Sequence, residues 1–329
     1  MNKFIIIFIK LICFFATLFS LKFTKKNYIF FKCCLKYFQY YHFLDKKCLS
    51  CPREVIFNGL KILSSEDTLD EIIKNNRSIS RFGDGEFNLI FGKKIGFQEV
   101  NKTLIKKLKK VLKCKKKGLL IGIFLPYKNN YLEQFIYVTK KYLISWMENK
   151  KLDLFTLIDL NKKYYSSFIT RFYMDYKDKS KVPYYIKKLK LIWEKRDILI
   201  IEGEKSRLGI GNDLFINSKS IKRILCPAEN AFNVYDKILE HAKKIDKSFL
   251  ILLALGPTSS ILAYDLYKLG YQVIDAGHID IEYEWYLRKA TKRISIDNKY
   301  VNEISGNKYK FGHFNDTKYN EEIISTIKN

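Results

Sequence analysis

Four short apolar runs, each ending in glycine, proline or charged residues, constrain the fold of this 329-residue chain most strongly. They are Gly118–Leu125, Asp197–Ile201, Phe249–Leu255 and Tyr271–Ile274. Continuous Val/Ile/Leu runs of this length are typical of parallel strands that are buried on both faces of a sheet. Because segments with helical periodicity alternate with them, the sequence predicts an α/β, Rossmann-like domain with a mostly parallel sheet flanked by helices.

A fifth predicted strand, Ser78–Phe82, leads into Gly83-Asp84-Gly85-Glu86. Two carboxylates separated by one glycine can bind Mg²⁺ or Mn²⁺, which take one or two protein carboxylates and complete their shell with phosphate oxygens and water. The two glycines let the backbone lie close to a bulky ligand. A surface turn is the alternative, since Gly-Asp-Gly is also turn chemistry. The position at a strand's exit, where open α/β sheets bind ligands, favours the metal site.

Polar residues follow two other predicted strands. Gly256, Pro257 and Thr258 precede a helical stretch, Ile261–Leu269, whose free amide groups could bind phosphate, although helix capping by Thr258 or Ser259 explains the same residues. The charged, glycine-containing loop 202–213 lacks the Lys-Ser/Thr ending of a phosphate-binding loop, which argues against an ATPase. Its Arg207 could clamp a diphosphate, unless this is a plain surface loop.

The segment 277–284 places His278, Asp280, Glu282 and Glu284 at alternate positions. In a strand all four would share one face, whereas in a helix His278 and Glu282 would still meet at four-residue spacing. Either arrangement brings an imidazole and a carboxylate together, as metal coordination or general acid–base work requires. A half-exposed edge element is the alternative.

Taken together, these segments resemble the GT-D fold glycosyltransferases, a bacterial family, across about residues 60–287. The resemblance rests on Ser80–Glu86, Ile201–Gly203 with Gly209–Phe215, Leu255–Pro257 and Gly277–Tyr283, in the family's order. It implies a Rossmann-like domain, a UDP-sugar donor, and an Asp-x-Glu metal motif on Asp84 and Glu86. It also implies a role in building surface glycans or glycosylating adhesins.

A mechanism of this kind assigns three groups of residues. Asp84 and Glu86 would bind Mn²⁺ or Mg²⁺, and Glu282 would act as the base for the acceptor hydroxyl, with Asp280 and Glu204 as the other candidates. The residues expected to bind the donor are Arg81, Gly83, Gly85, Arg207, Asn212, Gly256, Pro257, Thr258 and His278. Two rival functions are a metal-dependent phosphoesterase, which would use water in place of an acceptor, and a non-enzymatic, membrane-tethered protein that binds polyanions.

The domain expected from these motifs spans residues 56–297, after an apolar segment (1–24) and a basic, cysteine-containing linker (25–55), and before a polar tail (298–329). Residues Phe4–Phe23 are apolar over a length that can cross a bilayer, which predicts a membrane anchor or a membrane-surface helix. More lysines follow this segment than precede it, so the positive-inside rule places the domain on the cytoplasmic face of the membrane. This segment is a departure from the family's pattern.

Charge and cysteine content add weaker constraints. The chain has 60 Lys+Arg against 34 Asp+Glu, a net charge of +26, which favours anionic partners, although AT-rich codon usage explains much of it. The amphipathic basic stretch Lys102–Lys117 is either solvated or rests on anionic lipid, and we expect no nucleic-acid partner. Cys48 and Cys51 supply only half of a zinc site, so free thiols in a reducing compartment are the simpler interpretation.

Overall fold

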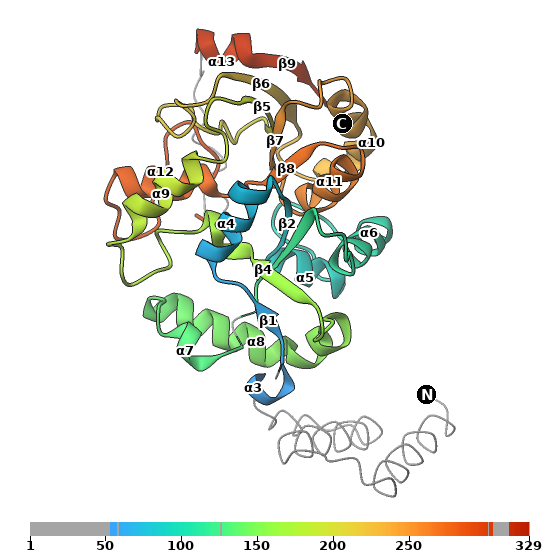
Figure 1. Cartoon of the computed structure of the whole chain (residues 1–329), viewed down its shortest axis with the longest axis vertical. Coiled ribbons are helices and arrows are strands. Elements are labelled where there is room, and N and C mark those ends of the chain that lie inside the picture. The colour runs from blue at the N-terminus through green and yellow to red at the C-terminus, as the bar shows by residue number, and fades with distance from the viewer. Residues whose placement is uncertain (1–52, 58, 126, 302, 305–315, 329) are drawn as a thin grey trace, which may run out of the picture.

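The computed structural model describes residues 53–57, 59–125, 127–301, 303–304 and 316–328. Nine parallel strands form one sheet in the order β1-β4-β3-β2-β8-β7-β5-β6-β9, which in Figure 1 runs from β1 below to β9 at the top. Helices cover both faces of this sheet (Figure 1). The predicted α/β class with a mostly parallel, helix-flanked sheet is therefore confirmed.

The strands are β1 (Lys61–Ile62), β2 (Ser78–Phe82), β3 (Leu119–Ile123), β4 (Lys163–Ser166), β5 (Asp197–Gly203), β6 (Ser220–Cys226), β7 (Leu250–Ala254), β8 (Gln272–Asp275) and β9 (Ile323–Thr326). The α-helices are α3 (Arg53–Ile56), α4 (Ser65–Asn75), α5 (Asp84–Ile90), α6 (Lys102–Leu112), α7 (Asn129–Leu132), α8 (Tyr137–Leu157), α9 (Val182–Lys190), α10 (Tyr235–Ala242), α11 (Pro257–Lys268), α12 (Ile279–Leu287) and α13 (Thr317–Glu322). Among the described residues, two 3₁₀ helices occur, η2 (Ser167–Thr170) and η3 (Ala231–Val234).

Strands β5 and β7 carry continuous apolar runs because each faces two hydrophobic cores. Leu199 and Ile201 of β5 pack into the core that contains residues of α5, α6, α8, α10 and α11. Ile198 and Ile200 of the same strand pack into the second core, with residues of α4, α9 and α12. Since side chains alternate along a strand, only a continuous apolar run can fill both cores.

The segment 277–284 is helical rather than extended. His278 caps α12, and the Glu282 amide donates a hydrogen bond to the His278 carbonyl oxygen at 3.1 Å. The predicted helix within Lys102–Lys117 is present as α6, and its apolar stripe, which includes Leu104 and Leu108, is buried.

The C-terminal residues differ from the polar, peripheral tail that was expected after residue 297. Strand β9 pairs with β6 at the edge of the same sheet, and Lys299 is buried at 4% exposure. Lys299 and β9 therefore belong to the domain, and the polar composition hid that fact because charged residues such as Lys299 and Glu322 are largely buried in ion pairs.

The predictions for residues 1–24 and for Cys33, Cys34, Cys48 and Cys51 lie outside the described residues. Within the part of the chain that is described, no helix is long and apolar enough to cross a membrane. Cys114 and Cys226 are free thiols.

Candidate functional site

A cavity of about 570 Å³ opens at the carboxyl edge of the sheet. It is lined by residues at the ends of strands or within two residues after them, among them Gly83 after β2, Gly203 at the end of β5, Pro227 after β6, Gly256 after β7 and Gly277 after β8. The carboxyl ends of parallel strands meet at one edge of a sheet, so segments that are far apart in the sequence reach one cavity.

Asp84 and Glu86 both line this cavity from the first turn of α5. Gly83 caps the helix, and its amide donates to Glu86 Oε2 at 2.7 Å. The Tyr142 hydroxyl, from α8, donates to Asp84 Oδ2. Carboxylates are favourable at a helix N-terminus because unpaired amide groups there carry partial positive charge. The local sequence therefore places both acids where a ligand can reach them.

The electrostatics of the Glu86 carboxyl suit a cation. Burial, and then the nearby Asp275 carboxylate, raise the pKa of Glu86 to about 7. A divalent ion would offset this excess of negative charge. No group of three or more His, Cys, Asp or Glu residues that could hold a metal occurs among the described residues. Two carboxylates would leave most of the coordination shell of such an ion to oxygens of the substrate and water.

Arg81 lines the cavity, but its guanidinium is engaged in joining β2 to its neighbours. Nε donates to the Asp275 carbonyl oxygen at 2.6 Å and Nη1 to the Ser167 carbonyl oxygen at 2.9 Å. A Cβ on Gly277 would lie 1.9 Å from Arg81 Nη2, so only glycine leaves room for this packing. Arg81 therefore holds the exits of β2 and β8 together beside the two acids.

The expected phosphate-binding turn after β7 is built around Gly256. Its φ of +54° and its contact with Phe97, whose Cε2 would be 2.4 Å from a Cβ, both require glycine. Gly256 lines the cavity, whereas Pro257 and Thr258 are buried in the first turn of α11 and are not among its lining residues. The Ser259 hydroxyl accepts a hydrogen bond from the Leu255 amide at 2.7 Å, which ties the first turn of α11 to the end of β7, whereas no side chain of the described residues caps the amide groups of the helix itself.

The loop after β5 brings fewer of the expected residues to the cavity. Glu204 is exposed, and neither Glu204 nor Arg207 is among the lining residues. Arg207 Nη1 donates to the Asn298 carbonyl oxygen at 2.6 Å. Both side chains therefore lie outside the cavity for which they were proposed.

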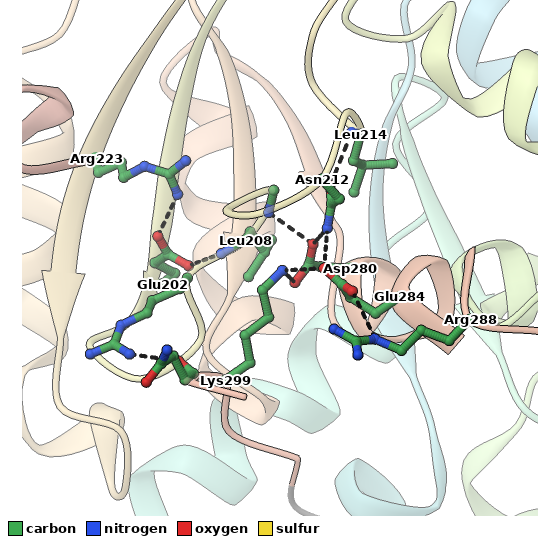
Figure 2. A network of polar contacts seen from close by, with 12 residues as sticks. Glu202, Leu208, Asn212, Leu214, Arg223, Asp280, Glu284, Arg288 and Lys299 are labelled. Carbon is green, nitrogen blue, oxygen red and sulfur yellow. Dashed lines mark hydrogen bonds and ion pairs between the residues drawn. The ribbon is translucent and has the colours of Figure 1, made fainter. Parts of the chain in front are cut away.

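Asp280 lines the cavity as part of a buried polar network (Figure 2). Its Oδ1 accepts from the Gly209 amide at 2.9 Å and from Asn212 Nδ2 at 2.8 Å, and its Oδ2 pairs with Lys299 Nζ at 2.7 Å. Lys299 and Asn212 also contact Glu284, at 3.0 and 2.7 Å. Both oxygens of Asp280 are thus engaged, and Asn212 fastens the loop to α12, so the geometry disfavours the expected roles of Asp280 as a base and of Asn212 as a donor ligand.

Glu282 lies apart from the cavity. It is fully buried, and its Oε2 accepts from the amides of Tyr173 at 2.8 Å and Met174 at 2.9 Å. Burial raises its pKa to about 7, but it is not among the lining residues. Because α12 is helical, the Glu282 side chain points toward the backbone at 173–174. It therefore does not reach the cavity, where a base for the acceptor hydroxyl would have to lie.

A ring of charged residues in the cavity has no signature in the sequence. Arg293 Nη2 and Nε lie 2.8 Å from Asp175 Oδ1 and Glu303 Oε2, and Arg171 pairs with Glu303 at 2.5 Å and with Asp175 at 3.7 Å. Burial would raise the pKa of Glu303, but Arg171, His278 and Arg293 lower it to about 2. These residues come from two distant segments, so spacing could not reveal them.

His278 lines the cavity beside this ring, with Nε2 3.8 Å from Glu303 Oε1. Burial, and then the positive charge of Arg171, lower the pKa of His278 to about 4. The imidazole is therefore neutral at physiological pH. It can accept or donate one proton but adds no positive charge for a phosphate.

Comparisons with known proteins agree with this arrangement. A family model described as "Glycosyltransferase GT-D fold" matches residues 79–304. The chain is 35% identical over 288 residues to glycosyltransferase GlyD of Streptococcus pneumoniae and 34% identical over 286 residues to a probable glycosyl transferase Gly of Streptococcus gordonii. These matches cover 87% and 86% of this chain, but the chain spans only 34% and 41% of those relatives.

Solved structures show the same fold. One, described as a domain with a distinct glycosyltransferase fold, superposes with a TM-score of 0.79 at 36% identity, covering 84% of this chain and 98% of that one. Another, described as a new glycosyltransferase from Streptococcus sanguinis, gives a TM-score of 0.77 at 31% identity, covering 82% of this chain and 100% of that one. This chain belongs to the family of glycosyltransferases with the GT-D fold.

Proposed function

We propose that this chain transfers a sugar from a UDP-sugar to a hydroxyl of a glycan or glycoprotein acceptor, with Mn²⁺ or Mg²⁺ bound at Asp84 and Glu86. The observation that carries the proposal is the position of these two carboxylates. Both stand on the first turn of one helix and line the cavity at the strand exits. A cation there, when bound, would act as a Lewis acid that stabilises the charge of the departing diphosphate.

The described residues support the donor's orientation along the sheet. In the strand order, the acids follow β2, and the part of the cavity over β7, β5 and β6 is lined by small residues that include Gly203, Ala228 and Gly256. Phe97, which contacts Gly256, adds an apolar ring. Backbone and small side chains leave room for a planar base, so we place the nucleoside in this part and the diphosphate at the acids.

The acceptor hydroxyl must lose a proton, and we assign His278 to this step in place of Glu282. His278 lines the cavity in its neutral form, so a ring nitrogen can accept the proton. The ionised Glu303 carboxylate, 3.8 Å from Nε2, favours the imidazolium that results and offsets part of the cost that burial and the charge of Arg171 impose on it. His278→Asn should therefore slow transfer and leave the affinity for UDP within about twofold, because it removes a proton acceptor but no phosphate ligand.

Two parts of the proposal concern the protein's setting. A surface glycan or adhesin acceptor, and attachment of the domain to the cytoplasmic face of a membrane through residues 1–24, stay predictions from the sequence. Deleting residues 1–24 tests the second: the protein should move from the membrane fraction to the soluble fraction. Unchanged fractionation would contradict the anchor.

The experiment that tests the catalytic proposal compares two double variants. Asp84→Ala/Glu86→Ala should abolish Mn²⁺-dependent UDP binding, measured by calorimetry, and sugar transfer. Glu66→Ala/Asp67→Ala is the matched control, since these acids occupy the first turn of α4 and are not among the cavity-lining residues. UDP binding of wild-type strength in the first variant would refute the proposal. Rapid UDP-sugar hydrolysis without any acceptor would instead favour a phosphoesterase.

A further inference from the structure

Exposed apolar side chains cluster on the first turns of α8, at the rim of the cavity. Tyr137 is 75% exposed, Val138 67% and Tyr142 48%. Of the ten large hydrophobic side chains that are exposed among the described residues, these three occur within six positions of one helix. Val138 and Tyr142 also line the cavity. Exposed apolar groups that adjoin a binding cavity mark a contact for a ligand or partner.

This rim is held firmly in place. The Ile136 amide donates to the Asp175 carbonyl oxygen at 2.9 Å, and the Thr139 hydroxyl donates to Asp175 Oδ1 at 2.8 Å. The Tyr142 hydroxyl donates to Asp84. The first turns of α8 are thus fastened both to the ring of charged residues and to one of the two acids, so they present a preformed surface.

The surface lies on the side of the acids opposite the proposed nucleoside part of the cavity. In the sheet, β2 carries the acids at its exit, with β8, β7, β5 and β6 on one side and β3 and β4 on the other. The residues that line the cavity on the second side include Phe124 after β3 and Phe168 of η2, together with Val138 and Tyr142. A donor whose diphosphate meets the acids would leave this second side free for the other substrate.

The chemistry of the rim fits a sugar ring better than a lipid chain. A pyranose has a face of C–H groups, which are attracted to the negative face of an aromatic ring, and an edge of hydroxyl groups. Asn88, Arg171 and Glu303 line the cavity and can hydrogen-bond such hydroxyls. An acyl chain in the same place would cover these polar groups without pairing them, which is unfavourable.

We infer that Val138 and Tyr142, four residues apart on the cavity side of α8, form with the adjacent exposed Tyr137 a platform on which a sugar ring of the acceptor stacks, next to the acid Asp84. This inference rests on the proposed function, since it assigns the second substrate of the same cavity. Tyrosine is suited to the role because it offers a large, rigid, amphipathic surface at low cost in conformational entropy. Tyr142 joins the two substrate sites, since it contacts Asp84 through its hydroxyl and belongs to the platform.

Saturation-transfer NMR on the full chain tests the platform, with the methyl β-glycosides of glucose, galactose and N-acetylglucosamine as probes and with UDP and Mg²⁺ present. At least one glycoside should receive saturation on its ring protons from the wild-type protein. Tyr137→Ala/Val138→Ser should weaken its binding by about fivefold or more, the loss expected for one aromatic contact. Both side chains are mostly solvated, so the melting temperature should stay near that of the wild type.

The matched control is Tyr184→Ala/Leu191→Ser, which removes an exposed tyrosine and an exposed aliphatic residue at α9, outside the cavity. This variant should bind the glycoside as the wild type does. The platform is overturned if no glycoside binds the wild type, or if the Tyr137/Val138 variant binds as tightly as the control. The platform is also overturned if the Tyr137/Val138 variant loses binding to phosphatidylcholine vesicles but keeps its binding to glycosides, a result that would mark a membrane contact.

UDP affinity, measured in the same samples, separates this inference from the donor proposal. If the wild type binds UDP but no glycoside, the platform fails and the donor site stands. If the wild type binds a glycoside through the platform but does not bind UDP, the donor proposal fails instead.

Discussion

Replacing Lys299 with methionine should strongly destabilise the domain, although this residue stands in a segment whose composition suggests a peripheral tail. Lys299 Nζ lies 2.7 Å from Asp280 Oδ2 and 3.0 Å from Glu284 Oε1, and all three side chains are nearly inaccessible to solvent (Figure 2). Methionine preserves most of the side chain's volume but removes the charge. Two buried carboxylates would then face each other without the cation between them.

The size of the expected loss of stability follows from the burial of Lys299 and its two carboxylate partners. Removing one partner of a buried ion pair typically costs about 3–5 kcal/mol, because the remaining charge stays desolvated and unpaired. Asn212 and the Gly209 amide would still donate to Asp280, which keeps the expected loss within this range. For a domain of this size the loss corresponds to a fall in melting temperature of roughly 6–20 °C.

Urea unfolding at pH 7 measures the effect, with Lys292→Met as the matched control for an exposed lysine in the same region. The control should change the free energy of unfolding by less than about 0.5 kcal/mol. Adding Glu284→Gln to Lys299→Met should recover part of the stability, since it removes one of the two unpaired charges. A loss below about 1 kcal/mol for Lys299→Met would refute the reasoning that these charges are buried and mutually dependent.

Two further predictions concern the cavity. Because the pKa of Glu86 is raised to about 7, a proton competes with the cation for this carboxylate. The affinity for Mn²⁺ should therefore fall by up to tenfold per pH unit below pH 7 and level off above pH 7. Calorimetry between pH 5.5 and 8 measures this, and a constant affinity would contradict the prediction. Gly256→Ala should lower the free energy of unfolding by about 1–3 kcal/mol more than Gly211→Ala does, and it should also weaken UDP binding. Both glycines have a positive φ, but only at Gly256 would the added Cβ meet Phe97. Equal unfolding free energies for the two variants would exclude the clash.

The sequence predicted the central strands because their physics is local. Strands such as β5 and β7 are apolar on both faces, so each appears in the sequence as a run of consecutive apolar residues. Strand β6 was missed because it contains Arg223, which is buried only through ion pairs with Glu202 at 2.6 Å and Glu322 at 2.7 Å. Partners that far away in the chain cannot be read from a local pattern.

The residues of the candidate site likewise fall into those that the local sequence predicted and those that it could not. Asp84 and Glu86 were found because a strand exit, two glycines and two acids are adjacent in the sequence, and the structure places both in the cavity. Arg171, Arg293 and Glu303 were not found because their meeting depends on how the chain after α12 returns over the sheet. Glu282 was given a role that its place disfavours, since periodicity showed that it could meet His278 but not which side of the helix faces the cavity.

The central claim is that Asp84 and Glu86 bind a divalent cation that also contacts the diphosphate of the donor. Anomalous diffraction from crystals grown with Mn²⁺ and UDP tests it most directly. The account predicts a manganese peak about 2.0–2.3 Å from a carboxylate oxygen of each acid and from diphosphate oxygens of UDP. UDP bound in the cavity with no manganese between it and these two carboxylates would contradict the account.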